Sequence, residues 1–473
     1  MNTGGFGFNF GNSNDDDDDE KRRREQNPFE AFGFGTPGDP SSSGQGAGGL
    51  GDMLNQFGQM LSGMGSTMNS PENSEPVNYK LAERIARQQI GAQSPVRDQD
   101  ANAVQEAVRL ADLWLDNSTD LPASGGRVLA WSSEDWLTQT LPMWKRLVTP
   151  VAEHMNEAQI ESLPEQAREM AGPMLQVMNS LSGMNFGMQL GNALGDLASQ
   201  ALTGSDFGLP VAPTDVTALL PANISSAAKD LDIKPQEVIV YVAARESARQ
   251  RLYRHVPWLV ERIVASVEEY AAGLVIDTSH IEEATRELNI ETGDPAALHD
   301  AMQRLQGMDL SPRISSRNAA AASRLETLLA LVEGWVEYVV TEALAERMPA
   351  TVPMTEAWRR RRASGGSAEQ AFAKIVGIEL NAPKITEAVE LWRRVDVAVG
   401  QQRRDKIWEH PDFMPLAEHL DNSAEFIDGL LDEGGDDGFD EEFAKLEEML
   451  RGEADKDDTE DTEDTDDTEE KDS

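Results

Sequence analysis

The sequence predicts a mainly α-helical protein with an unstructured segment at each end. Between residues 79 and 427, apolar side chains recur at intervals of three and four positions, the spacing of one face of a helix. No stretch there alternates convincingly between apolar and polar residues, as a half-buried strand would. The two ends are rich in small, polar or acidic residues, and such compositions cannot bury enough apolar surface to offset the entropy of ordering the chain.

Composition divides the 473 residues into four segments. Residues 1–78 form a Gly/Phe-rich arm that we expect to be disordered. Within it, apolar spacing at 50–64 predicts a short amphipathic helix, which docks either on the protein's own core, the interpretation we favour, or on another protein. Residues 79–207 form an N-terminal helical region, and residues 208–427 form a second helical domain. Residues 428–473 hold 23 acidic and four basic side chains, so this acidic tail should also be disordered.

Helices should follow one another from Tyr79 onward, each with an apolar stripe for the core. The segment Gly208–Pro221 is punctuated by prolines and should connect two of them. The predicted helices are residues 80–90, Asn102–Leu115, Glu134–His154, Ile160–Met178, a helix opening at Pro235, Glu261–Leu274, His280–Leu305 and Arg324–Glu346.

Four glycines spaced four positions apart, Gly183, Gly187, Gly191 and Gly195, fall on one side of a further predicted helix. Such a pattern can mark a helix pair in a membrane, but polar residues interrupt this run and argue against a bilayer. Glycine costs about 1 kcal/mol relative to alanine inside a helix. We therefore expect the bare face to admit another backbone at close range.

The net charge of −43 argues against general nucleic-acid binding, because that binding depends on Lys and Arg displacing counterions. The chain has no cysteine, which excludes disulfides and thiolate metal ligands. We see neither a signal peptide nor an apolar run of about 18 residues that would span a membrane. We expect a cytoplasmic protein whose partner is an unidentified protein rather than nucleic acid or a membrane.

The stretch Tyr241–Leu259 carries the most informative motif. Arg245 and Arg249 lie four positions apart, so they share one side of the predicted helix, and Glu246 follows the first of them. In zinc hydrolases the pattern His-Glu-x-x-His has the same spacing, with two histidines on the metal and a glutamate that activates the metal-bound water. Here the glutamate is present and both histidine positions hold arginine.

Two further stretches make this comparison specific. Val256–Leu259 reads VPWL and Leu331–Val340 reads LVEGWVEYVV. With the first motif they resemble an actinobacterial zincin-like family, whose members are named "putative hydrolase" or zinc-dependent metalloprotease and are related to proteins associated with deazaflavin coenzyme biosynthesis. The likeness continues through residues 359–380 and 407–427 and extends from Leu181 to Ile427.

The resemblance implies a zincin-like multi-helix domain with a site between two helices. In metal-competent members the acid of the second motif is the third metal ligand, and it corresponds to Glu333, with Glu337 one turn further on. Glu246 corresponds to the catalytic glutamate, whereas Arg245 and Arg249 occupy vestigial metal-site positions. Because arginine has no lone pair for a metal, we expect both guanidinium groups to bind Glu333 in place of Zn²⁺, with Glu337 as a second candidate acceptor.

His255 leaves two interpretations open. It lies six residues after Arg249, the offset of the third histidine in metzincin-type motifs, which would make it a metal ligand. However, Leu252 stands where that motif has a glycine, and the first two ligands are missing. We favour a packed histidine beside Trp258.

The run Arg359–Arg362 also has two interpretations. In so acidic a protein, four consecutive arginines most simply form surface ion pairs, and we favour that explanation. The alternative is a local site for an anion.

Two function classes follow from the resemblance. The first, which we favour, is a non-catalytic relative of zincins that acts as a binding or scaffolding module and needs no cofactor. The second is an active zinc-dependent metalloprotease or other hydrolase that uses Glu246 and unidentified metal ligands. Other catalytic motifs are missing: the sequence contains no GxSxG and no P-loop.

Overall fold

The computed structural model describes residues 75–161, 172–231, 233–277, 313–364, 366–376 and 380–433. The predicted arm up to residue 74, with its helix at 50–64, lies outside the described residues. So do the predicted helix His280–Leu305 and the acidic tail from residue 434. Helices dominate the described residues, which confirms the predicted fold class.

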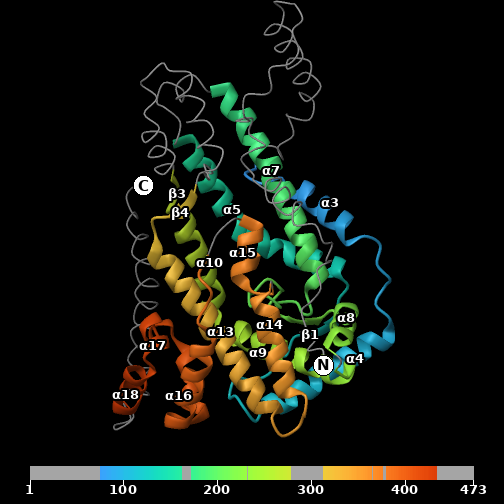
Figure 1. Ribbon diagram of the computed structural model, residues 1–473, viewed down its shortest axis with the longest axis vertical. Coiled ribbons are helices and arrows are strands. Elements are labelled where there is room, and N and C mark those ends of the chain that lie inside the picture. The colour runs from blue at the N-terminus through green and yellow to red at the C-terminus, as the bar shows by residue number, and fades with distance from the viewer. Residues whose placement is uncertain are drawn as a thin grey trace, which may run out of the picture.

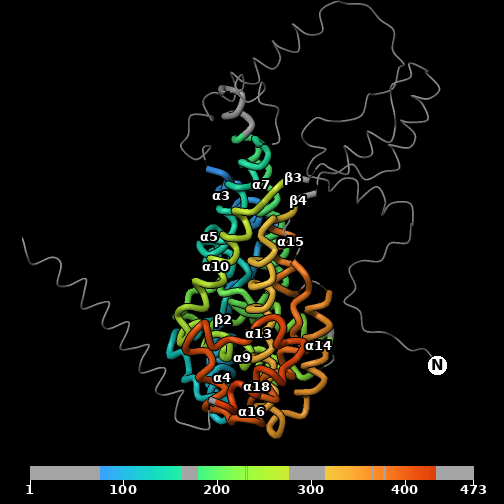
Figure 2. The backbone as a smooth tube through the Cα atoms, turned by 90° about the vertical axis from the view of Figure 1, so that its left-hand side faces the viewer, coloured from blue at the N-terminus to red at the C-terminus, as the bar shows by residue number. Residues whose placement is uncertain are grey.

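Figures 1 and 2 show an elongated bundle in which helices from distant parts of the sequence lie together. The helices of the first half are α3 (Tyr79–Ile90), α4 (Asp98–Leu115), α5 (Ser133–Glu161), α7 (Gly172–Gln200) and α8 (Pro221–Leu231). The later helices are α9 (Pro235–His255), α10 (Pro257–Ala271), α13 (Ala319–Leu344), α14 (Thr351–Ala363), α15 (Ala368–Val376), α16 (Ile385–Lys406), α17 (Ala417–Asp421) and α18 (Ser423–Glu433). Two short 3₁₀ turns, η3 (Ile407–Glu409) and η4 (Pro411–Phe413), follow α16.

Four short strands among the described residues have no counterpart in the prediction. Strand β1 (Arg127–Ala130) pairs in parallel with β2 (Val216–Leu219), and β3 (Leu274–Asp277) pairs antiparallel with β4 (Arg313–Ser316). Each has only four residues, too few to display an alternating pattern. The β1–β2 pair ties the region before residue 207 to the region after it.

Helix α9 lies at the centre of the bundle and contacts α4, α8, α10, α13 and β2. It begins at Pro235, a residue suited to the first turn of a helix because its missing N–H has no partner there. Every residue from Tyr241 to Tyr253 is buried, including charged ones. Charged side chains at such positions need partners inside the protein, since burying a lone charge is costly.

The glycine ladder on α7 packs against α3, as the sequence predicts. A Cβ atom on Gly187 would come within 2.6 Å of the Asn78 carbonyl oxygen, and one on Gly191 within 2.7 Å of the Ala82 carbonyl oxygen. The Asn78 N–H also donates to the Gly183 carbonyl at 2.9 Å. A second backbone therefore does occupy the bare face of the helix.

We expect Gly187→Leu to lower the free energy of unfolding by several kcal/mol, because overpacking costs about 1–3 kcal/mol even where the backbone can yield. Gly429 provides a matched control, since a Cβ atom there meets nothing within 4 Å. Gly429→Leu should leave stability equal or slightly higher. Thermal unfolding compares the two variants, and an unchanged melting temperature for Gly187→Leu would contradict the packing of α3 on α7.

Several predicted boundaries are wrong: α4 begins at Asp98 instead of Asn102, α5 continues to Glu161 instead of His154, and α10 begins at Pro257 instead of Glu261. The acidic tail was expected from Asp428, but α18 continues to Glu433, where Leu430 is buried. Helix α13 begins at Ala319 rather than Arg324, because the Asn318 side chain caps it by accepting from the Ala321 N–H.

Within the described segments, none of the helices combines the length and the apolar character needed to cross a membrane.

Candidate functional site

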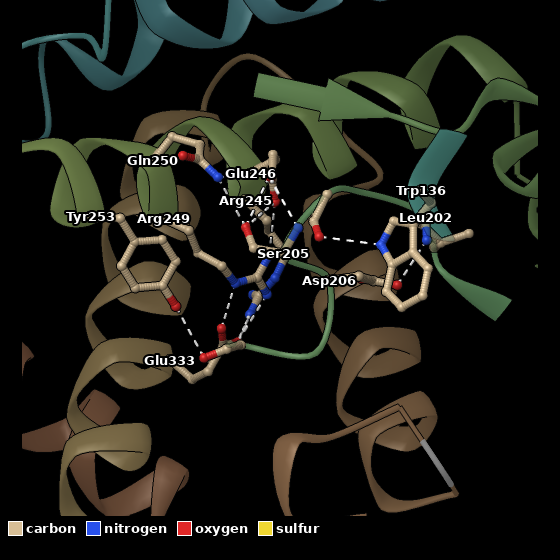
Figure 3. A network of polar contacts seen from close by, with 12 residues as sticks. Trp136, Leu202, Ser205, Asp206, Arg245, Glu246, Arg249, Gln250, Tyr253 and Glu333 are labelled. Carbon is tan, nitrogen blue, oxygen red and sulfur yellow. Dashed lines mark hydrogen bonds and ion pairs between the residues drawn. The ribbon is translucent and has the colours of Figure 1, made fainter. Parts of the chain in front are cut away.

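Helices α9 and α13 bring the predicted residues together in the interior. Arg245, Glu246 and Arg249 project from α9, and Glu333 projects from α13 toward them (Figure 3). All four side chains are buried. The spacing of four places both arginines on the side of α9 that faces α13.

Glu333 accepts hydrogen bonds from both arginines. Arg249 donates from Nε to Oε1 at 2.5 Å and from Nη2 to Oε2 at 3.0 Å, a two-pronged contact. Arg245 donates from Nη2 to Oε2 at 2.8 Å. The geometry is that of a charge-assisted pair, which is shorter and stronger than a neutral hydrogen bond.

A third arginine completes this cluster. Arg362, near the end of α14, donates from Nη1 to Oε2 of Glu333 at 2.9 Å. Burial alone would raise the pKa of Glu333, but Arg249, Arg362 and Arg245 outweigh it and hold that pKa well below its usual range. Glu333 is therefore ionised at any ordinary pH, and both of its oxygens are occupied by guanidinium groups.

The interpretation of the arginine run as surface ion pairs is wrong for two of its four members, Arg361 and Arg362, whose side chains are largely buried. Besides Arg362, Arg361 pairs with buried Asp206 at 2.6 Å, and Arg359 pairs with buried Glu337. Arg359, whose side chain is 48% exposed, and Arg360, which pairs with Glu356, are surface arginines as expected. The helical period could have predicted that part of the run is buried. Four consecutive helical residues are turned about 100° apart, so they surround the axis and cannot all face solvent.

Glu246 has different partners from Glu333. Ser205 donates to it from the backbone N–H at 3.2 Å and from Oγ at 2.9 Å, and Gln250 donates from Nε2 at 3.0 Å. The nearest guanidinium nitrogen, Nη1 of Arg249, is 3.8 Å away. Burial raises the pKa of Glu246, and these partners only partly oppose it. The two neighbouring arginines do not lower this pKa below its usual value, because Arg245 and Arg249 both turn toward Glu333.

The loop between α7 and β2 covers this centre. Its residues from Leu202 to Val211 are all buried, and Ser205 is its contact with Glu246 (Figure 3). Gly208 has φ = 75° and lies so close that a Cβ atom there would be 3.0 Å from Oε1 of Glu333. Its carbonyl accepts from the Tyr253 hydroxyl at 3.0 Å. The loop thus fills the space directly above both carboxylates.

Sequence reasoning did not identify this loop. Its members lack a charge pattern that points to Glu246 or Glu333, and Asp206 is the only ionisable residue between Leu202 and Val211. Asp206 is held by Arg361 and by the Leu202 N–H at 2.8 Å. The Trp136 indole N–H fixes the loop from the other side, at 3.2 Å from the Gly204 carbonyl.

Glu337 does not take part in the Glu333 cluster. It was a candidate acceptor for Arg245 and Arg249, but Arg359 holds it instead, with Nε at 2.8 Å. One helical turn moves its side chain past the two α9 arginines and toward α14. The Arg245 guanidinium extends toward the Trp358 ring, 4.9 Å from the ring centroid, where a cation–π contact is favourable.

His255 and Trp258 lie apart from the centre. His255 is the last residue of α9 and is exposed, with Nε2 3.3 Å from the Ala123 carbonyl, so the favoured description of a packed histidine is wrong. The helix ends before its side chain can turn inward. Trp258 is partly buried and donates to the Trp408 carbonyl at 2.9 Å.

The centre does not fit a zinc ion. Hydrolytic zinc needs about three nitrogen or oxygen ligands from the protein. Among the described residues, no group of three or more His, Cys, Asp or Glu side chains could hold a metal. At Glu333 the nearest groups are three guanidinium cations, which repel a metal ion and offer no lone pair.

Comparisons with known proteins agree with the fold. One solved structure has 16% identity and a TM-score of 0.52, over 75% of this chain and 98% of its own: "a putative hydrolase with a novel fold from Chloroflexus aurantiacus". At that identity the likeness shows the fold alone. No curated protein matches the sequence. The family model described as "Zincin-like metallopeptidase" matches residues 77–427, most of the chain and every described element of the centre. The chain therefore belongs to the zincin-like metallopeptidase family.

Proposed function

We propose that this protein is a zincin-like family member with a degenerate metal motif, which acts by binding another protein and not by hydrolysis. The observation that carries the proposal is the occupation of Glu333 by three buried guanidinium groups. Arg245 and Arg249 stand where the motif resemblance places metal-binding histidines. Together they bring the two positive charges that Zn²⁺ would bring, so the carboxylate is neutralised without a Lewis acid.

The surroundings of Glu246 support the same conclusion. A general base must reach the proton it removes, directly or through one water molecule. The Glu246 carboxylate is fully buried, and Ser205 and Gln250 already donate to it. A substrate would have to displace the loop from Leu202 to Val211 before it could approach either carboxylate.

One observation favours a second candidate, a working hydrolase. Burial raises the pKa of Glu246, and a raised carboxyl pKa is common among catalytic acids and bases. This candidate requires metal ligands other than those at the centre. We give it second place because the same shift follows from burial of any carboxylate.

Zinc analysis of the purified protein separates the two. We expect far less than one zinc per chain after expression in zinc-supplemented medium, and no change in melting temperature when zinc is added, because an ion that binds the folded state must stabilise it. A protein-hydrolysis assay provides a second measurement. In it, a control chain carrying Glu246→Ala should behave identically to the natural protein. One zinc per chain, or hydrolysis that Glu246→Ala abolishes, would overturn the proposal.

We further propose that the chain is related to the actinobacterial proteins associated with deazaflavin coenzyme biosynthesis that its motifs resemble. This relationship rests on the VPWL stretch at Val256–Leu259 and on the second motif around Glu333. Within this proposal, the family scaffold is retained and its surface provides the binding function.

A further inference from the structure

A groove of about 540 Å³ lies on the surface, and its lining includes none of Arg245, Arg249, Arg362 and Glu333. Helices α10 and α13 form its floor, and the segment from Pro411 to Glu418 forms one wall. Its apolar lining includes Trp258, Leu328, Met414 and Leu416, and Leu416 is 58% exposed. An open apolar groove of this size is typical of a site that receives another segment or molecule.

We propose that residues 439–451 of this same chain bind in the groove as an amphipathic helix. Four apolar residues in that segment, Phe439, Phe443, Leu446 and Leu450, are spaced by four, three and four positions and would share one face of a helix. The flanking glycines and the acidic residues at the start of the segment are typical of helix ends. The inference is independent of whether the centre binds metal.

The position of the chain at Glu433 makes this occupant reachable. Helix α18 packs on α17, where the rings of Phe426 and His419 are 5.3 Å apart, and the first residues of α17 belong to the groove wall. Phe439 lies only six positions after Glu433, and an extended chain of that length spans about 20 Å. This reach exceeds the length of α18, which is about 16 Å. The connection can therefore run back along α18 and bring Phe439 to the groove.

Charge favours this segment over the other candidate in the sequence. Four charged residues line the groove: Arg262 and Arg324 on α10 and α13, and Asp412 and Glu418 on the segment from Pro411 to Glu418. Arg262 is exposed and has no ion-pair partner among the described residues, while Arg324 pairs with Glu269. Residues 439–451 carry five acidic and two basic side chains, whereas the helix predicted at 50–64 carries a single charge. Residues 439–451 carry charges of both signs, as the groove does, so this segment is the better electrostatic complement.

Disulfide trapping tests the proposal cleanly, because the chain has no cysteine of its own. Ser323, an exposed residue of the groove, would be changed to cysteine in the full-length protein. A second cysteine would replace Phe443 or Leu446 on the apolar face, or Glu448 on the opposite face, about 180° away by the helical period. Ser226→Cys, on an exposed position of α8 across the molecule, replaces Ser323→Cys in the matched control.

We expect Ser323→Cys to form an intramolecular disulfide with Leu446→Cys or Phe443→Cys at least about tenfold faster than with Glu448→Cys, since binding raises the effective concentration of one face. The Ser226→Cys pairs should be slow throughout. Equal rates for both faces, or for Ser226 and Ser323, would show a segment that collides at random and would overturn the proposal. Disulfides that form only between two chains would assign the groove to a second copy. The absence of any disulfide would assign the groove to another partner. Either outcome would also overturn the proposal.

Discussion

Replacing Glu333 by glutamine should lower the free energy of unfolding by about 3–5 kcal/mol, the range seen when one member of a buried ion pair is removed. Three guanidinium groups, those of Arg245, Arg249 and Arg362, would remain buried around a neutral amide. The amide keeps the shape of the side chain but not its charge, so the loss reports on electrostatics. Urea unfolding followed by circular dichroism measures it.

Glu390→Gln is the matched control, because Glu390 also pairs with two arginines, Arg393 and Arg394, but on the surface. Solvent screens such pairs, and their removal should change stability little. The interaction among buried charges would be refuted if the two substitutions had equal effects.

The pH dependence gives an independent readout of the same interaction. The pKa of Glu333 is held low in the folded protein, so its contribution to stability is present above the unfolded value of about 4.3 and is lost as pH falls further. The difference in stability between the natural protein and Glu333→Gln should therefore be largest near neutral pH. It should shrink as the pH is lowered below about 4, where the unfolded glutamate binds the proton that glutamine mimics.

A triple substitution, Arg245→His, Arg249→His and Arg362→Gln, should convert the centre into a zinc site. The two histidines would face Glu333 from adjacent turns of α9 and provide three ligands with it, the number that hydrolytic zinc requires. Zinc at a hundredfold excess over its dissociation constant should then stabilise the variant by about 2.7 kcal/mol, measured as a rise in melting temperature. The natural protein should show no rise.

The double variant Arg245→His and Arg249→His is the informative control. Arg362 still donates to Oε2 of Glu333 in that chain and keeps a positive charge beside the intended metal position. We expect it to bind zinc more weakly than the triple variant. A folded triple variant that ignores zinc would mean that the two α9 positions and Glu333 do not converge as metal ligands, and the zincin interpretation of this centre would fail.

The sequence was informative wherever a pattern repeated with the helical period. Arg245 and Arg249 could be placed on one face because residues four apart are neighbours on a helix, and the second motif supplied Glu333 as their partner. The close approach of another backbone to α7 was predictable from four glycines, although they did not identify α3 as the partner. In each case the spacing along one element was enough to define a face.

Interactions that depend on the meeting of several elements were not predictable. Ser205 reaches Glu246 only because the loop between α7 and β2 packs against α9, and nothing in its composition shows that path. Arg362 reaches Glu333 through the angle of α14, which spacing does not specify. The short strands were not predicted for a related reason, because β1 and β2 pair across distant parts of the chain.

The long separation between Arg249 and Glu333 has a consequence for synthesis of the protein on the ribosome. Glu333 is added 84 residues after Arg249, which at about 5–20 residues per second means a delay of about 4–17 s. During that interval α9 carries two arginines without the carboxylate that permits their burial. Its central position in the bundle can thus be completed only after α13 leaves the ribosome, so the nascent chain must remain open, or be held by a chaperone, until then.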